Sequence, residues 1–166
     1  MRRLTLESFC RDAQGELAYQ AIWSHAPFLV GGFLVATNGH VLVWKVATAD
    51  DRDRPKLADE PVPTGGTRCA NVLKIIAQHP GAAACRKPWP TCEAIAEEGI
   101  SYPEKRVYFP QKLRYSIDAV YRDRVARFGK SLDAEVLYAT PRSATKPVAF
   151  TVGEYLGLLL PLRSHA

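Results

Sequence analysis

The chain has 166 residues, of which 47% are apolar and 23% charged, a balance typical of one globular domain or of one domain with a large insertion. No apolar run reaches the ~18 residues that a membrane-spanning helix needs, and no apolar signal-peptide core follows the basic start, so we expect a cytoplasmic protein. The net charge of +5 permits contact with phosphate backbones, but it also fits an ordinary soluble surface.

The first quarter of the chain predicts one helix followed by three strands. Residues 5–13 place their apolar side chains on one helical face, and residues 17–24 alternate apolar and polar side chains as a half-buried strand does. Residues 33–47 then predict a β-hairpin. Its turn is Asn38-Gly39, a strong short-range hairpin signal, because both residues accept a positive φ angle.

The middle of the chain changes character. Residues 48–68 are charged at first and then rich in proline and glycine, which predicts an exposed linker. Residues 71–79 resume a helical pattern, and residues 82–91 predict a loop that Trp89 pins to the core. Residues 92–102 are ambiguous between a strand and a helical turn.

The last third of the chain predicts a strand, a helix and three further strands. The first strand covers residues 106–109, and the helix covers residues 111–128 and ends at Gly129. The predicted inner face of the helix consists of Leu113, Ile117, Val120, Tyr121, Val125 and Phe128. The three strands follow at residues 135–139, 147–152 and 155–162. Both ends of the chain therefore predict the same unit, a helix followed by three strands.

The cysteines suggest an alternative of another class. Cysteines stand at positions 10, 69, 85 and 92, and none forms a Cys-x-x-Cys pair. A zinc site could be drawn from Cys69, His79, Cys85 and Cys92, although their spacing matches no common structural zinc pattern. We expect reduced thiols and no metal or other cofactor, with Cys10 and Cys69 as small core residues, because cytosolic disulfides are disfavoured. A small zinc-binding domain remains the alternative.

Two short motifs resemble the bacterial DNA polymerase sliding clamp, the β subunit. The first is Ala36-Thr37-Asn38-Gly39-His40-Val41-Leu42, which resembles the Ala-Thr-Asp-Gly-His-Arg-Leu turn of that family, with a valine in place of the arginine. The second is Leu160-Pro161-Leu162-Arg163, which resembles the Met-Pro-Met-Arg ending of the same clamps, with leucines in place of methionines.

The resemblance implies a fold class. It predicts an α+β protein, a single DNA-clamp-like domain over residues 1–166, built from two helix-plus-three-strand units at residues 1–47 and 106–163. Residues 48–105 are then a long central insertion that enlarges the join between the units. The clamps that this chain resembles have three such domains in each chain, and this chain has room for one.

The resemblance also implies a peptide-binding groove. In clamps the turn motif and the last strand form an apolar groove that receives short linear motifs of replication and repair proteins. The matching positions here are Thr37, Gly39, His40, Leu42, Leu158, Leu160, Pro161, Leu162 and Arg163. In the family the two motifs come from adjacent domains, so we expect that a head-to-tail homo-oligomer would bring His40 of one copy near Pro161 of the next.

A second implied surface is the outer face of the long helix. In clamps the helices face the DNA backbone, and basic side chains there neutralise phosphates without reading bases. The basic residues in this part of the chain are Lys112, Arg114, Arg122, Arg124, Arg127 and Lys130. The competing interpretation is an ordinary solvated helix face, because Asp118 and Asp123 dilute the positive charge.

We therefore expect a non-enzymatic sliding-clamp-like protein of DNA replication that binds DNA, replication-protein peptides or both. No Ser/His/Asp or Cys/His arrangement stands out, and no glycine-rich loop carries the residues of a phosphate site. Two forms of this hypothesis stay open. The chain could oligomerise into a ring around DNA, or it could be a clamp-like interaction module of phage or plasmid type that forms no ring.

Overall fold

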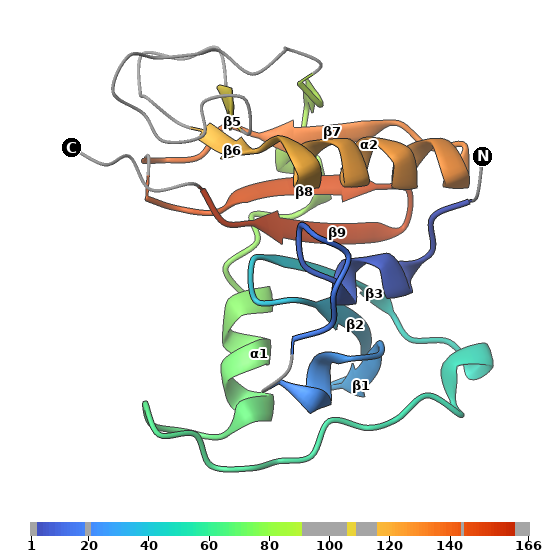
Figure 1. The fold of residues 1–166 in the computed structure, drawn as a ribbon, viewed down its shortest axis with the longest axis vertical. Coiled ribbons are helices and arrows are strands. Elements are labelled where there is room, and N and C mark those ends of the chain that lie inside the picture. The colour runs from blue at the N-terminus through green and yellow to red at the C-terminus, as the bar shows by residue number, and fades with distance from the viewer. Residues whose placement is uncertain (1–2, 19–20, 91–105, 109–115, 144, 162–166) are drawn as a thin grey trace.

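The computed structural model describes residues 3–18, 21–90, 106–108, 116–143 and 145–161. These residues form a mixed α+β fold around a seven-stranded antiparallel sheet, in agreement with the predicted class (Figure 1). The strand order is β1-β2-β3-β9-β8-β7-β4, and a separate small sheet pairs β5 with β6. None of the helices in the described ranges is long and apolar enough to cross a membrane.

The strands of the large sheet are β1 (Phe28–Val30), β2 (Phe33–Thr37), β3 (Val41–Val46), β4 (Lys87–Pro88), β7 (Val136–Ala139), β8 (Val148–Val152) and β9 (Tyr155–Leu159). The small sheet contains β5 (Arg106–Tyr108) and β6 (Ser116–Asp118). The α-helices are α1 (Arg68–Ile76) and α2 (Ala119–Leu132). Short 3-10 helices are η1 (Leu6–Cys10), η2 (Ile22–Ser24), η3 (Ala49–Asp51) and η4 (Ala82–Ala84).

Pairing between β3 and β9 joins the two halves of the sheet. Val41 lies opposite Leu159 and Leu42 opposite Leu158, so two strands that are far apart in the sequence are neighbours. On one side of this pair lie β2 and β1, and on the other lie β8 and β7. η1 packs against β2 and β3, and α2 packs against β7 and β8. Each half thus combines three strands with one helical segment.

One face of the sheet is covered by η1 and α2 together. An apolar core, which we call the first core, lies between the sheet and these two helical segments. Because side chains alternate along a strand, Leu34 and Ala36 of β2 and Val148 and Phe150 of β8 lie in this core. Phe9 of η1 meets Phe128 of α2 edge to face, with ring centroids 5.1 Å apart. This contact continues the first core across both halves of the sheet.

The opposite face is covered by the segment that the sequence predicted as an exposed linker, together with the helix after it. Leu57 is buried, and Val72 and Ile76 of α1 pack with Val35 and Trp44 of the sheet. The prediction of an exposed linker over residues 48–68 was therefore wrong at Leu57. The described part of the predicted insertion, residues 48–90, covers the apolar core on this face, which we call the second core.

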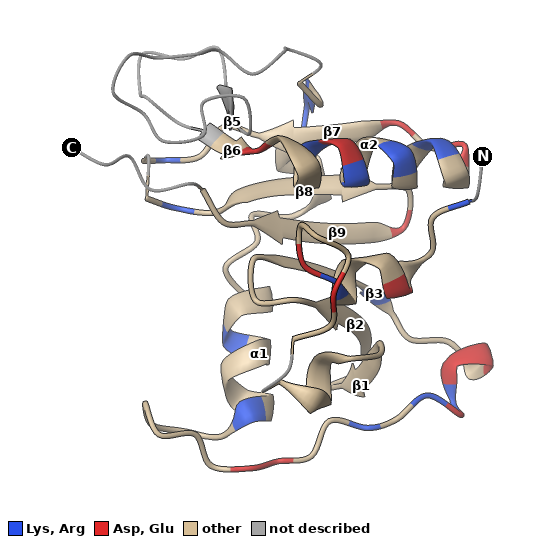
Figure 2. Cartoon of the chain, in the orientation of Figure 1, with Lys and Arg blue, Asp and Glu red and all other residues tan. Residues whose placement is uncertain are grey.

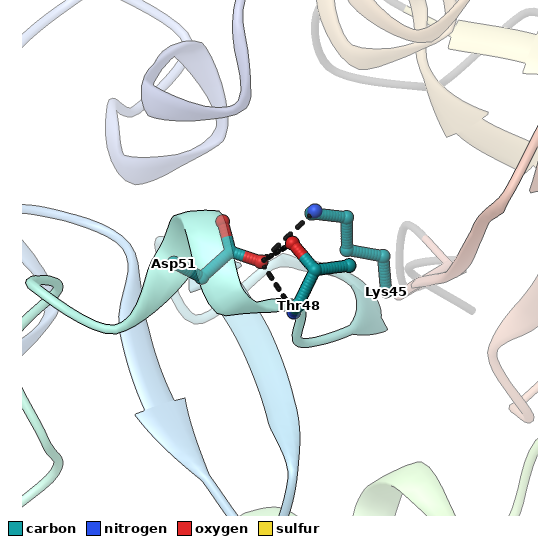
Figure 3. A network of polar contacts seen from close by, with 3 residues as sticks. All are labelled: Lys45, Thr48 and Asp51. Atoms are coloured by element: carbon teal, nitrogen blue, oxygen red, sulfur yellow. Dashed lines mark hydrogen bonds and ion pairs between the residues drawn. The ribbon is translucent and has the colours of Figure 1, made fainter.

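A polar network fastens the start of this segment to the sheet (Figure 3). Asp51 Oδ2 accepts hydrogen bonds from the backbone N–H of Thr48 at 2.8 Å and from its hydroxyl at 3.2 Å, and Lys45 Nζ lies 3.0 Å away. The Thr48 backbone N–H and the Lys45 ammonium both lower the pKa of Asp51. The network links the last part of β3 directly to η3.

The predicted strand over residues 17–24 is wrong. Ile22–Ser24 form the 3-10 helix η2, in which the hydroxyl of Ser24 donates to the carbonyl of Ala21 at 2.8 Å. This 3-10 turn breaks the alternation that would have placed Ala21 and Trp23 on one face of a strand. The third strand of the first half is instead β1, directly after Pro27.

The long helix begins later and ends later than predicted. Asp118 caps α2 by accepting the backbone N–H of Val120 at 2.8 Å, and Ile117 belongs to β6 rather than to the helix. Residues 111–115 lie outside the described ranges. Gly129 does not end α2, because the helix continues to Leu132. A Cβ atom on Gly129 would come within 2.5 Å of Val136 Cγ2, so the glycine allows close packing of helix on strand.

The remaining predictions fare better. The hairpin over 33–47 is confirmed as β2 and β3, and the three last strands are confirmed as β7, β8 and β9, with β9 ending at Leu159. The first helix is reduced to η1, and α1 begins earlier than residue 71. Trp89 is buried as predicted, and its Nε1 donates to the carbonyl of Arg122 at 3.0 Å. Residues 92–102 lie outside the described ranges.

Candidate functional site

The turn between β2 and β3 is built by side chains that bond to its backbone. Asn38 Oδ1 accepts the backbone N–H groups of His40 at 2.8 Å and Val41 at 3.0 Å. The hydroxyl of Thr37 donates to the carbonyl of Val41 at 2.7 Å and accepts the N–H of Gly39 at 3.1 Å. Only Gly39 of the predicted pair has a positive φ, of 91°, so Asn38 supports the turn through its side chain rather than its backbone angle.

The end of β9 lies beside this turn. The backbone N–H of Leu160 donates to the carbonyl of His40 at 2.9 Å, which continues the β3–β9 ladder by one residue. The two motifs of the resemblance therefore meet within one chain. A head-to-tail oligomer is not needed to bring His40 near Pro161.

A pocket of about 270 Å³ lies at this junction, and we call it the junction pocket. It is lined by Asp12, Ala13, Gln14, His40, Asp118, Tyr121, Leu160 and Pro161. The lining comes from the loop after η1, the β2–β3 turn, the start of α2 and the end of β9. Four segments that are far apart in the sequence thus build one site.

Hydrogen bonds hold these segments together under the pocket. Asn38 Nδ2 donates to the carbonyl of Arg11 at 2.7 Å and to the Tyr121 hydroxyl at 2.9 Å. The Arg124 guanidinium donates to the carbonyls of Arg11 at 2.5 Å and Asp12 at 2.6 Å. Burial raises the pKa of Tyr121, so its hydroxyl keeps its proton at neutral pH. The network fixes the loop, the turn and α2 relative to one another.

The floor and one wall of the pocket are aromatic. The exposed ring of His40 stacks on the buried ring of Tyr121, with centroids 6.1 Å apart and an interplanar angle of 23°. The Arg124 guanidinium carbon lies 5.1 Å from the centroid of the Tyr121 ring. Leu160, which is 46% exposed, adds an apolar wall.

The structure separates the residues predicted for the peptide groove into three groups. His40, Leu160 and Pro161 line the pocket, while Thr37 and Gly39 shape the turn next to it. Leu42 and Leu158 lie in the second core on the other face of the sheet and do not line this pocket. Leu162 and Arg163 lie outside the described ranges. The lining of the pocket is not apolar throughout, because it includes the carboxylates of Asp12 and Asp118.

Figure 2 shows both basic and acidic positions along α2, and the basic residues predicted for DNA have different environments. Arg122 lies 2.7 Å from Asp123 and its side chain is only 16% exposed, and Arg124 belongs to the network under the pocket. Arg127 and Lys130 are exposed. Lys112 and Arg114 lie outside the described ranges.

The described members of the zinc alternative are engaged elsewhere. His79 Nε2 lies 3.1 Å from the carbonyl of Phe150, and its Nδ1 accepts the backbone N–H of Gly81 at 2.9 Å. The thiols of Cys69 and Cys85 point to backbone carbonyls, at 3.3 Å and 3.7 Å. Over the ranges that the structure describes, no three metal-ligating side chains are grouped. Cys92 lies outside those ranges.

Reasoning from the sequence did not find Asp12, Asp118, Tyr121 and Arg124 as parts of the site. Tyr121 was predicted as a core residue and Arg124 as a DNA contact, because helical periodicity separates only an inner from an outer face. Spacing gives no sign that the loop at Asp12 lies beside a turn 26 residues later.

Comparisons with known proteins add no relative. No family model matches the chain, and neither the curated proteins nor the solved structures contain a match.

Proposed function

We propose that this chain is a non-enzymatic, clamp-like interaction module of the cytoplasm that takes part in DNA replication by holding a short segment of a partner protein. One observation carries the proposal. The β3–β9 pairing brings the turn at His40 and the Leu160-Pro161 segment to a single pocket. These are the same two motifs in which the sequence resembles the peptide groove of sliding clamps.

The arrangement of the sheet supports the clamp-like part of the proposal. Two halves, each with three strands and one helical segment on the same face, meet edge to edge at β3 and β9. This agrees with the two helix-plus-three-strand units that the resemblance implies. The added layer of α1 on the opposite face is a feature that the resemblance did not imply.

The sheet edges favour the module over the ring. The outward N–H and carbonyl groups of Leu29 in β1 already bond to Pro55 and Leu57, at 2.8 Å and 2.9 Å. At the other edge β4 has two residues and one of them is Pro88, which cannot donate to a further strand. Strand addition between copies is therefore hindered at both described edges.

Contact with DNA is a second, weaker proposal. It is supported by Arg127 and Lys130, which are exposed on α2. Such contacts would neutralise phosphates and weaken steeply as salt rises. An R127A/K130A variant should bind a duplex less well at low salt, and unchanged duplex binding by this variant would remove the proposal.

The peptide proposal can be tested by selecting a phage-displayed library of random heptapeptides on the immobilised protein. We expect enriched peptides that bind the wild type and lose binding to an H40A/L160S variant, in which two exposed pocket residues are changed. The matched control is I22S/V46S, which alters two apolar residues that are 74% and 68% exposed outside the pocket lining. The proposal fails if no peptide is enriched, or if both variants bind the enriched peptides equally well.

A further inference from the structure

The junction pocket holds two carboxylates that each keep an oxygen available. Asp12 Oδ1 accepts the backbone N–H groups of Gln14 and Glu16, both at 2.9 Å, and Asp118 Oδ1 accepts that of Val120 at 2.8 Å. Within the described part of the chain, Oδ2 of neither aspartate accepts a hydrogen bond. Both carboxylates are held in place by their bonded oxygen while the second oxygen can accept a bond from a ligand.

The remaining lining is suited to a long aliphatic stem. Leu160 and Pro161 provide apolar surface, and the Tyr121 ring forms a buried floor. The volume of about 270 Å³ lies below the ~300–1,000 Å³ of pockets that enclose whole small-molecule ligands. The pocket therefore has the size for a single long side chain of a larger partner.

Resting on the proposed function, we infer that the junction pocket receives one lysine or arginine side chain of the partner segment. Its methylene stem lies along Leu160 and Pro161, and its cationic head donates to Asp12 and Asp118. The Arg124 guanidinium is attracted to both carboxylates, but its hydrogen bonds go to the backbone carbonyls of Arg11 and Asp12, so it leaves the second oxygen of each carboxylate open. A phosphate group would be repelled by the two carboxylates, so DNA is excluded from this pocket.

The test compares a cation with a neutral molecule of nearly the same shape. The amide resonances of the ¹⁵N-labelled protein are followed during titration with n-butylguanidinium and, separately, with n-butylurea. We expect shifts for the guanidinium alone, centred on Gln14, His40 and Leu160, and reduced when salt is raised. A D12N/D118N variant should weaken this binding about tenfold or more, since asparagine keeps the Oδ1 acceptors but removes both charges.

The matched control is D50N/D53N, which changes the net charge equally at two exposed positions outside the pocket. Equal shifts with n-butylurea, guanidinium binding retained in D12N/D118N, or an equal loss of binding in D50N/D53N would each overturn the inference.

The heptapeptide selection separates the two proposals. Enriched peptides that have no lysine or arginine at a fixed position, and that bind D12N/D118N as well as wild type, would end the inference and leave the proposed function intact. Binding of n-butylguanidinium in the pocket without any enriched peptide would support the cation site and count against the proposed function.

Discussion

At the residue scale, Gly157 shows how closely the centre of the sheet is packed. It lies in β9 opposite Phe150 of β8, and the Phe150 ring is fully buried across the position where a side chain would begin. A Cβ atom on Gly157 would lie 2.1 Å from Phe150 Cζ, which no side chain can tolerate without a shift of the ring. The absence of a side chain at 157 is what lets this aromatic ring fill the first core.

We expect Gly157→Ala to lower the free energy of unfolding by about 1–3 kcal/mol, as overpacked core substitutions do. Urea denaturation measures the loss. In a Phe150→Leu background the same change should cost less, because the smaller side chain leaves room for the methyl group. Equal costs in both backgrounds would show that the ring is not the cause.

His79 links a buried residue to the pH dependence of stability. Burial lowers the pKa of His79 below its ordinary value of 6.5. Its neutral ring accepts the Gly81 N–H at Nδ1 and donates from Nε2 to the Phe150 carbonyl. The imidazolium could not make the first of these bonds, since both of its nitrogens carry protons.

A lowered histidine pKa means that the unfolded chain binds the proton first as the pH falls. The contribution of His79 to stability is therefore complete above pH 6.5 and is lost as the pH falls from there through the folded-state pKa. We expect the urea midpoint of the wild type to fall across this window, and that of His79→Gln to fall less. Parallel curves for the two proteins would assign the pH dependence to other groups.

At the scale of secondary structure, the start of α2 serves both the fold and the pocket. Asp118 is the last residue of β6 and the N-cap of α2, and it also lines the junction pocket. Three residues into the helix, Tyr121 forms the pocket floor, and Arg124 lies one turn further on. The helix cap thus sets the register of every α2 residue that reaches the site.

Removing this cap should be measurable. Asp118→Ala leaves the backbone N–H of Val120 without its acceptor, and we expect a loss of about 1 kcal/mol in unfolding free energy. Asp118→Asn should lose far less, because asparagine is an equally good N-cap. Thermal denaturation of the two variants tests this, and an equal loss in both would indicate that the charge, not the cap, is important.

Local patterns predicted most elements of this fold. The hairpin and the last three strands came from β-rich runs bounded by turn residues, which are short-range signals. Residues 17–24 misled because Leu17, Tyr19, Ala21 and Trp23 fit an alternating pattern, although Ile22–Ser24 form η2 and Ile22 is 74% exposed. β1 was missed because Pro27 indicated a break, whereas a proline is tolerated directly before an edge strand. Gly31-Gly32 joins β1 to β2 with two positive φ angles, of 54° and 81°. This is the turn geometry that the sequence predicted for Asn38-Gly39 between β2 and β3.

At the scale of the whole molecule, the site could be predicted only in part. The resemblance singled out His40, Leu160 and Pro161, and all three line the pocket. The contribution of Asp12 and Asp118 depends on how the loop after η1 and the start of α2 pack in three dimensions. Likewise, periodicity identified apolar residues in α1, but not the face of the sheet that they cover.

Because both described edges of the sheet are hindered from pairing with another copy, we expect a monomer. We expect light scattering on a size-exclusion eluate to give the molar mass of one chain at several protein concentrations and at two salt levels. Leu29→Pro would remove the N–H that donates to the Pro55 carbonyl at this edge. It cannot serve as a test of the blocked edge, because the proline would also disturb β1. A closed higher oligomer would contradict the module and restore the ring hypothesis, to be followed with circular and linear DNA.

The central position of β9 has a consequence for how the protein is made. β9 is the last strand in the described chain, yet it lies between β3 and β8 and completes both cores. Until the ribosome has passed Leu159, β3 and β8 each present an unpaired edge flanked by apolar side chains. The sheet cannot close gradually during synthesis, so the nascent chain passes through an aggregation-prone stage. The residues directly after this late strand, Leu160 and Pro161, lie beside His40, so the sheet and the junction pocket are completed in a single event.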